Sequence, residues 1–279
     1  MTTSPIDTQQ PAVYLCQVGA NVSCGACCGL YNVADASPEG IEAMLERRTR
    51  WFAAVPRTVA GLDAFAAQVK ASEPQERPFP DFHHCPYLGL IIDDGRRVGC
   101  LLHPLAVGNG GVDWRGLSYY GGMACRTYFC PSVRQLPARW LAALGQSMDH
   151  WHLHGLIVTE RKLLAAFFTA VEKRLGRPVE AGRFTAGSRA ATWLNQFAAL
   201  KTDWPHKRTG APGPGNYFFE DGRYPRPGVW RENDAIPASP VETILAELDS
   251  GFASAAALEN AQDRITSIID GLAAELMPR

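Results

Sequence analysis

The spacing of the cysteines constrains this chain more strongly than any other feature of its sequence. Seven of the eight cysteines fall into three blocks, which read C-G-A-C-C at 24–28, C-P-Y and then C-L-L-H-P at 85–87 and 100–104, and C-R-T-Y-F-C-P at 125–131. Two cysteines separated by two residues lie on one tight turn, from which both thiolates can reach the same metal ion. The candidate ligands are Cys16, Cys24, Cys27, Cys28, Cys85, Cys100, Cys125 and Cys130. The pattern predicts a protein that binds a soft metal.

Cys27 and Cys28 are adjacent, and adjacent side chains are expected to point in different directions. They therefore fit two metal ions, or one metal ion and a contact just outside its ligand shell, better than one shared ion. Four disulfide bonds and ordinary buried thiols are the alternatives for the eight cysteines. A vicinal pair fits poorly into a disulfide framework, and a reducing cytoplasm keeps thiols free, so we favour metal ligation.

Taken in order, the blocks C-G-A-C-C, C-P-Y-L, Cys100 and C-R-x-Y-x-C resemble the YkgJ-type cysteine-cluster family, also called CxxCxxCC, which is described as zinc- or iron-chelating. The resemblance covers about residues 16–135. The family pattern carries another cysteine three residues before Cys24, where this chain has Asn21, and Cys16 lies further upstream. The family includes flagellin lysine N-methylases, which look like iron–sulfur proteins.

The resemblance implies a metal centre that supports redox or group-transfer chemistry, such as N-methylation of lysine on a protein substrate. The alternative function is a binding module in which structural zinc holds a fold that acts through protein partners without catalysis. An open coordination position would favour the enzyme, whereas a closed site of four thiolates would favour the module.

The identity of the metal stays open in the sequence. A donor set made almost entirely of thiolates suits a 4Fe-4S cluster, which four cysteines hold, and equally suits a tetrahedral zinc ion. Eight thiols can hold one cluster and a structural zinc, or two metal centres. His103 is a candidate zinc ligand, although we favour a hydrogen bond to the backbone for this histidine. We expect an iron–sulfur cluster, in part because of the resemblance, with zinc as the alternative or second metal.

Charge and hydropathy exclude several other classes of protein. The formal net charge of −1 gives no general attraction to nucleic acid or to acidic lipid. Residues 1–12 lack the basic and apolar regions of a signal peptide, and the longest apolar stretch, 163–171, is too short to span a bilayer. We therefore expect a cytoplasmic protein that binds neither nucleic acid nor membrane. The oligomeric state is not predicted.

The chain divides into five segments on composition and periodicity, and each has an expected structure. They are a flexible N-terminus at 1–15, the cysteine-cluster region at 16–135, a helical region at 136–202, a loop rich in proline, glycine and aromatic residues at 203–238, and C-terminal helices at 239–279. The predicted fold is mainly α with a small β-hairpin, in which helices wrap a loop-rich cysteine core.

Local signals place the elements within these segments. Ser37 is predicted to cap a helix, a second helix is expected at 58–71, and the apolar residues from 140 to 151 keep helical spacing. Further helices are expected around 163–175, which Gly176 should end, around 193–200, and from the capping box at 239–242 to residue 272. A hairpin is expected about Asp94-Gly95, with Gly89 opposite Cys100, and it brings Cys85 to the end where Cys100 and His103 lie.

Several histidines and one aromatic segment could take part in binding or catalysis, and for each of them a structural role is also considered. His83 and His84 precede Cys85 and are expected to donate hydrogen bonds to metal-bound sulfur. The alternating histidines at 150, 152 and 154 are expected to pack within a helical region, and no nearby acid completes a metalloenzyme motif. The segment 204–230 is read as a solvated loop with arginines stacked on aromatic rings, with binding of an acidic or aromatic partner as the alternative.

Overall fold

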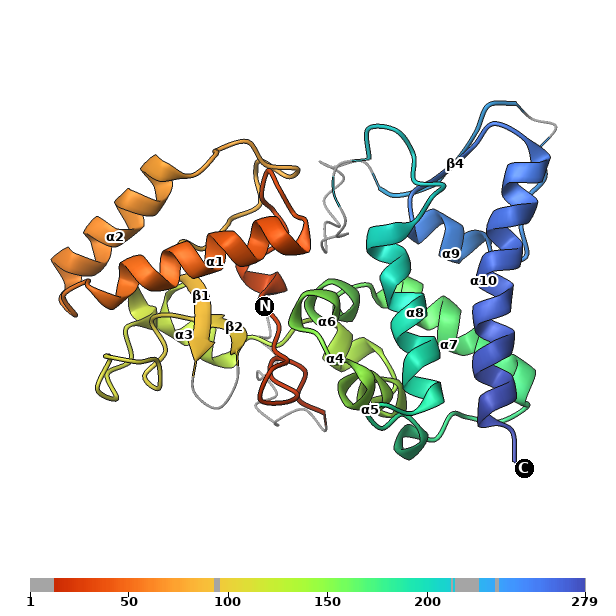
Figure 1. Cartoon of the computed structure of the whole chain (residues 1–279), viewed down its shortest axis with the longest axis horizontal. Helices are drawn as coiled ribbons and strands as arrows, with labels where there is room; N and C mark the ends of the chain where they lie inside the picture. Colours follow the sequence, from red (N-terminus) through yellow and green to blue (C-terminus); the bar gives the residue numbers. More distant parts are fainter. Residues whose placement is uncertain (1–12, 93–95, 212, 214–225, 234–235, 279) are drawn as a thin grey trace, which may run out of the picture.

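The computed structural model describes residues 13–92, 96–211, 213, 226–233 and 236–278. Its described part is mainly helical and contains a two-stranded antiparallel hairpin, as predicted (Figure 1). The helices are α1 (Pro38–Ala53), α2 (Val59–Ser72), α3 (Gly121–Thr127), α4 (Ser132–Gln135), α5 (Ala138–Ser147), α6 (Trp151–Val158), α7 (Arg161–Leu175), α8 (Arg189–Asp203), α9 (Glu242–Glu247) and α10 (Ala255–Leu276). The strands are β1 (Leu88–Ile92), β2 (Arg96–Cys100), β3 (Val229–Arg231) and β4 (Ser250–Phe252), and short 3₁₀ turns lie at Ala26–Cys28, Arg115–Leu117 and Ala181–Arg183. None of the helices in these ranges is both long and apolar enough to cross a membrane.

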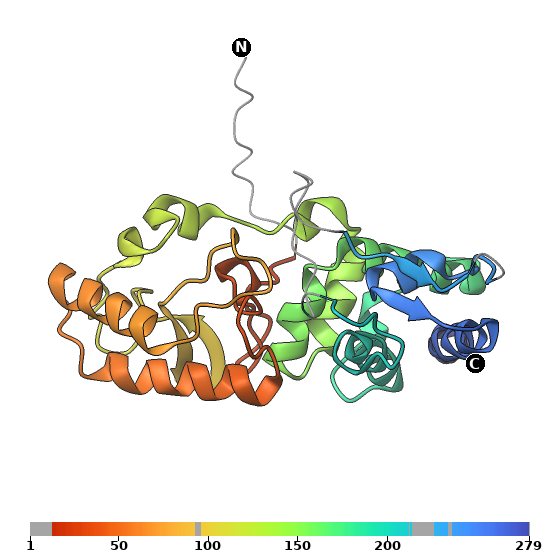
Figure 2. The same cartoon turned by 90° about the horizontal axis from the view of Figure 1, so that it is seen from above.

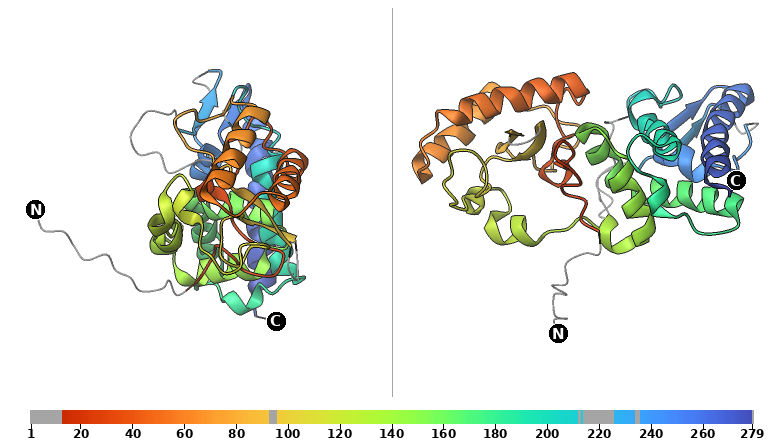
Figure 3. Two further views of the ribbon diagram at one scale, coloured as in Figure 1. Left: turned by 90° about the vertical axis from the view of Figure 1, so that its left-hand side faces the viewer. Right: turned by 60° about the horizontal axis from the view of Figure 1, so that its bottom comes forward.

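Two hydrophobic cores organise the described part of the chain as two lobes (Figure 1). The first core joins α1, α2 and the hairpin, and the second joins α5 to α10. Helix α7 shows why the second lobe folds, because its five apolar stripe residues are completely buried and each contributes about 1.5–3 kcal/mol of transfer free energy. In the first lobe, α1 and α3 lie on opposite sides of the hairpin (Figures 2 and 3).

Where the two lobes meet, each hydrophobic core includes residues from segments that belong mainly to the other lobe. Leu15 and Val22 come from the N-terminal segment but pack in the second core, whereas Trp151 and Leu156 of α6 pack in the first core. The hydroxyl of Tyr31 donates a hydrogen bond of 2.6 Å to the carbonyl oxygen of residue 152 and is buried. The segment that carries the first cysteine block is therefore fixed at the junction of the lobes.

The predicted helix ends are confirmed at several positions. The Ser37 hydroxyl accepts a hydrogen bond from the backbone N–H of Gly40 at 3.0 Å and caps α1. Gly176 ends α7 in the left-handed conformation, with φ of 68°. The predicted capping box forms only in part: Glu242 accepts a hydrogen bond from the N–H of Ser239 at 2.9 Å, but the N-cap of α9 is Val241 and no side chain caps the helix.

Three expectations about elements are wrong in detail. The expected helical run from 140 to 151 is broken, because His150 is extended and its ring accepts a hydrogen bond from the backbone of His152, so it caps a new helix, α6. The C-terminal helical region is interrupted by β4, and Ser254 caps α10 separately. The expected loop at 203–238 contains β3, which pairs in parallel with β4.

The hairpin forms, but its register differs by one residue from the prediction. Cys100 lies opposite Leu88, and Gly99 lies opposite Gly89. The pairing of Ile92 with Arg96 leaves three residues between the strands, whereas the prediction assumed a turn of two. A shift of one residue moves every side chain to the other face of a strand, so the error matters for Cys100. The predicted Asp94-Gly95 turn lies outside the described residues.

Candidate metal centre

The first cysteine block forms a compact turn that also holds Cys16. Residues Ala26–Cys28 make a 3₁₀ turn, and Gly29 ends it with φ of 79°. The backbone N–H of Cys24 donates to the carbonyl oxygen of Cys16 at 2.9 Å, which places the upstream cysteine directly beside the block. The position three residues before Cys24, Asn21, instead accepts a hydrogen bond from the backbone of Arg96. Cys16 is therefore the cysteine that joins Cys24.

The second block is joined to the first through backbone contacts. The N–H of Cys85 donates to the carbonyl oxygen of Cys28 at 2.9 Å. His84 Nδ1 lies 2.8 Å from the carbonyl oxygen of Gly29. A Cβ atom on Gly29 would overlap the carbonyl oxygen of His83 and lie 2.9 Å from the Cα of His84, so only glycine allows this approach. The close approach of two segments 55 residues apart thus depends on one glycine.

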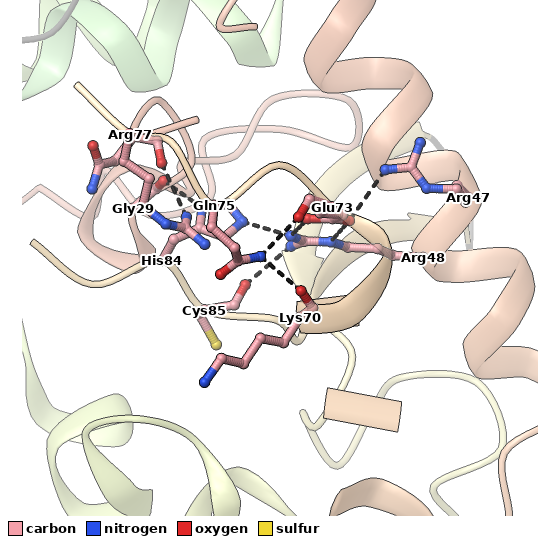
Figure 4. A network of polar contacts seen from close by, with 10 residues as sticks. Gly29, Arg47, Arg48, Lys70, Glu73, Gln75, Arg77, His84 and Cys85 are labelled. Atoms are coloured by element: carbon pink, nitrogen blue, oxygen red, sulfur yellow. Dashed lines mark hydrogen bonds and ion pairs between the residues drawn. The ribbon is translucent and has the colours of Figure 1, made fainter. Parts of the chain in front are cut away.

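A buried arginine fixes the backbone around Cys85 (Figure 4). Arg48, on α1, has no exposed surface, and its guanidinium is paired with Glu73, with a distance of 2.8 Å from Nε to Oε1. The same guanidinium donates to the carbonyl oxygen of Cys85 at 3.1 Å and lies 2.6 Å from Nε2 of His84. Figure 4 shows the sulfur of Cys85 directed away from this network. The arginine therefore holds the main chain of Cys85, while its sulfur is directed elsewhere and interacts with the backbone of Tyr87.

The histidines beside Cys85 differ from each other. Burial, with Arg48 nearby, lowers the pKa of His84 to about 3, so His84 is neutral and both its nitrogens face Gly29 and Arg48. The predicted bond from His84 to sulfur is therefore wrong. His83 Nδ1 lies 2.8 Å from the Tyr120 hydroxyl, and the ring also interacts with the backbone of Cys27. Burial lowers the pKa of His83, and the interaction with the Cys27 backbone opposes this shift. A hydrogen bond from His83 to sulfur stays a prediction.

The hairpin brings Cys100 to the region of Cys85, as predicted except for the register. Leu101, next to Cys100, donates its N–H to the carbonyl oxygen of Tyr87 at 2.8 Å. His103 accepts a hydrogen bond on Nδ1 from the backbone N–H of Leu105 at 3.2 Å, which is the role that we favoured for it. The hairpin therefore gathers Cys85 and Cys100, and His103 bonds to backbone.

The two cysteines of the third block lie in different surroundings. Cys125 lies on α3, and its sulfur is 2.9 Å from the hydroxyl of Ser118. Cys130 follows α3, and the ring of the preceding Phe129 contacts Tyr14 edge-on at 6.1 Å between centroids. Tyr14 precedes Cys16 by two residues, so this contact brings Cys130 to the N-terminal segment.

Electrostatic interactions link the thiols in two overlapping sets, of which the first we call group I, and Cys27 of this set also acts on Cys28 and Cys85. Group I contains Cys16, Cys24, Cys27 and Cys130. A hydrogen bond with Cys28 lowers the pKa of Cys27, and the charge on Cys27 acts on the other three thiols. Burial, followed by this charge, raises the pKa of Cys16 to about 12. Burial and the charge on Cys27 also raise the pKa of Cys24.

Group II contains Cys28, Cys85, Cys100 and Cys125. Burial raises the pKa of Cys85 to about 11, and burial together with Cys85 raises the pKa of Cys100 to about 12. Cys125 is the next thiol whose charge acts on both. The two groups meet at Cys27 and Cys28, whose thiols share a hydrogen bond, so these two side chains do not diverge as fully as expected.

The eight cysteines are all free thiols. Over the ranges that the structure describes, no three side chains of His, Cys, Asp or Glu are already arranged around a position for one metal ion. The donor type nevertheless suits a soft metal, because thiolates are the ligands that soft metals prefer and the backbone holds Cys16 beside Cys24 and Cys85 beside Cys28. Metal binding would displace the thiol protons that burial retains and would draw the sulfurs together.

A hollow of about 500 Å³ lies beside Cys130. Its lining residues are Thr127, Tyr128, Phe129, Pro131, Arg134 and Gln135. Tyr14, Tyr119, Tyr120 and Tyr128 are about half exposed or more, and the charge on Cys27 acts on three of them, all except Tyr119. The sequence analysis did not single out Tyr128, which lines the hollow, or the exposed pair Tyr119 and Tyr120.

The remaining histidines and the 204–230 segment have structural roles. His152 Nε2 lies 3.3 Å from the carbonyl oxygen of Ala36, and His154 Nε2 lies 2.8 Å from that of Leu15, so both connect α6 to the N-terminal segment. Arg208 stacks over the ring of Trp230 at 4.9 Å, as the reading of stacked arginines predicts. Much of that segment, including 214–225, lies outside the described residues.

Comparisons with protein-family models, with curated proteins and with solved structures found no match.

Proposed function

We propose that this chain is a metal-binding protein in which cysteine thiolates hold an iron–sulfur cluster, with zinc as the alternative metal. The observation that carries the proposal is that backbone hydrogen bonds hold Cys16 beside Cys24 and Cys85 beside Cys28, so two distant free cysteines lie at the turn 24–28 that carries three more. Soft metals prefer thiolate ligands, and a C-x2-C step places two thiolates within reach of one metal ion. The resemblance to the YkgJ-type family points the same way.

The protein around the thiols suits such a centre. Arg48 and Gly29 fix the backbone on which Cys85 and Cys28 lie, so the ligands start from held positions. The Ser118 hydroxyl lies 2.9 Å from the sulfur of Cys125 and can donate a hydrogen bond to it. Hydrogen bonds to sulfur and solvent exposure set the reduction potential of an iron–sulfur cluster, and electron transfer is the chemistry that such a cluster supplies.

A reactive role is proposed over a purely structural module. The hollow is lined by Phe129 and Pro131, the two sequence neighbours of Cys130, and it is the proposed approach for reactants, whereas a closed structural zinc site needs no access. Redox or group-transfer chemistry, with N-methylation of a protein lysine as the activity that the resemblance implies, is therefore the proposed class. The partner in that case is a protein substrate.

Metal analysis of the full chain purified without oxygen tests the proposal. We expect brown protein that contains iron and acid-labile sulfide and absorbs near about 400 nm through charge transfer from sulfur to iron. Colourless protein with stoichiometric zinc would overturn the choice of iron and keep the thiolate site. Metal-free protein whose eight thiols all react with a thiol reagent would overturn both.

A further inference from the structure

Tyr128, Phe129 and Pro131 give the hollow beside Cys130 an aromatic and apolar lining. The ring of Phe129 is held by Tyr14, which packs edge-on against it with 6.1 Å between the ring centroids. Tyr128 is 48% exposed, so part of its side chain is accessible from solvent. Ligand sites in proteins have volumes of about 300–1,000 Å³ and combine such a lining with a few placed polar groups. The hollow, at about 500 Å³, falls within this range.

The polar side chains of the lining offer hydrogen-bond donors. Over the ranges that the structure describes, the guanidinium of Arg134 has neither a hydrogen-bond partner nor an ion-pair partner. Gln135 is bonded through Oε1 to the guanidinium of Arg161. Because a guanidinium only donates, this bond occupies the amide oxygen and leaves the Nε2 of Gln135 as a donor. The lining contains no aspartate or glutamate, so these donors suit a group that only accepts, such as a carboxylate.

The charge of the surrounding sequence favours one negative group on the ligand. Residues 114–148 contain four arginines and no acidic residue, although the whole chain has a net charge of −1. Arg134 is the member of this set without a carboxylate partner in the described part of the chain. One unpaired cation matches a single carboxylate, whereas nucleic acid requires several cations for its phosphates. The carboxylate partners of the other arginines are Asp113, for Arg115 and Arg126, and Glu172, for Arg139.

The short helix α4, which carries Arg134 and Gln135, is fixed to the second lobe. The Ser132 hydroxyl is buried and donates a hydrogen bond to the carbonyl oxygen of Val158 at 2.6 Å. Leu136, directly after α4, is buried in the second core. Arg134 and Gln135 are exposed, although the residues on either side of them are anchored. The two donors are therefore presented to solvent from a backbone that is already in place.

We propose that the hollow beside Cys130 binds a ligand with one carboxylate next to an aromatic or apolar group. The carboxylate accepts hydrogen bonds from Arg134 and Gln135. The apolar group packs on Tyr128 and Phe129. None of the lining residues is a cysteine, so this site goes beyond the proposed metal function and does not depend on it. A small free acid and the C-terminus of a polypeptide that ends in an apolar residue both supply this chemistry.

NMR titration of the full chain with two matched pairs of probes tests the proposal. Phenylacetate and phenylacetamide differ in the charge of the carboxyl group, as do an N-acetylated triglycyl-phenylalanine peptide and its C-terminal amide. Each acid should bind at least about fivefold more tightly than its amide, and added salt should reduce the difference. Tighter binding of the peptide acid than of phenylacetate would support the site with a polypeptide end as its ligand. Equal or weaker binding of the peptide acid would support it with a free acid.

Three variants separate the roles of the lining, and urea unfolding shows that each is folded. Arg134→Gln should bind each acid no more tightly than its amide, because the cation is lost. Tyr128→Ala should weaken the acids and the amides alike, because it removes an aromatic wall. Arg50→Gln should bind as the parent does. Arg50, on α1, is also exposed and without a partner in the described ranges, but it does not line the hollow.

Three results would overturn the proposal, namely no binding of either acid, equal binding of acid and amide by the parent, or equal losses in Arg50→Gln and Arg134→Gln. The metal content of the same protein keeps the two proposals apart. Metal-free protein that binds the acids would overturn the proposed function and support this site, whereas protein with its metal that binds neither acid would overturn this site alone.

Discussion

Replacing Gly29 by alanine tests how the first and second cysteine blocks are brought together. Gly29 and Gly176 both end a helical turn with positive φ, 79° and 68° respectively, and an L-residue in that conformation costs about 1–2 kcal/mol. They differ in their surroundings. A methyl group on Gly176 would meet nothing within 4 Å, whereas one on Gly29 would overlap the backbone of His83. Gly176→Ala is therefore a matched control for the backbone conformation alone.

The expected cost of Gly29→Ala includes the separation of the two segments. Moving residue 29 away from residue 83 would break the hydrogen bonds from His84 to Gly29 and from Cys85 to Cys28, each worth about 0.5–1.5 kcal/mol. We expect Gly29→Ala to lower the free energy of unfolding by roughly 2–5 kcal/mol, against about 1–2 kcal/mol for Gly176→Ala. The variant should also lose metal, although it removes no thiol.

Urea unfolding and metal content, measured on both variants in parallel, provide the assay. Equal losses of stability in the two variants, with metal fully retained in Gly29→Ala, would refute the reasoning. Such a result would mean that the close approach of the blocks is not what positions Cys28 and Cys85.

Two further predictions concern charged groups. Arg48→Met should lower the free energy of unfolding by about 3 kcal/mol or more, because it leaves the nearly buried Glu73 without its main cation. In urea unfolding, the double variant Arg48→Met/Glu73→Leu should recover part of that loss. A double variant no more stable than Arg48→Met would contradict this prediction. The guanidinium of Arg139 lowers the pKa of Glu172 to about 2. This carboxylate therefore stabilises the fold fully above a pH of about 4.5, and its contribution is lost as the pH falls toward 2. The difference in unfolding free energy between the parent and Glu172→Gln should shrink between pH 7 and pH 3, and a constant difference would contradict the assignment.

Local signals predicted elements well wherever the cause is local. Ser37 and Gly176 act within a few residues of their own position, so their roles could be read from the sequence. The break before β4 could not, since it depends on Asp249, which takes φ of 51° and binds Arg208 from a distant segment. The hairpin was recognised from its composition, but its register depends on the length of the turn, which an Asp-Gly step does not fix alone.

The candidate site was predicted in its members but not in its arrangement. The spacing of the cysteines indicated metal ligation, yet the approach of Cys16 to Cys24 and of Cys85 to Cys28 depends on backbone hydrogen bonds that no spacing rule predicts. Arg48 was missed although a signal existed, because it occupies a position in the apolar stripe of α1 where a buried residue is expected. A charged residue in such a stripe predicts a buried partner, here Glu73.

X-ray absorption at the K edge of the bound metal tests the central claim most directly, because it reports the atoms that surround the metal. The account predicts a first shell of sulfur alone, at about 2.3 Å, which is the distance of thiolate ligands. Nitrogen or oxygen as the main ligands, in protein whose cysteines still react as free thiols, would contradict it.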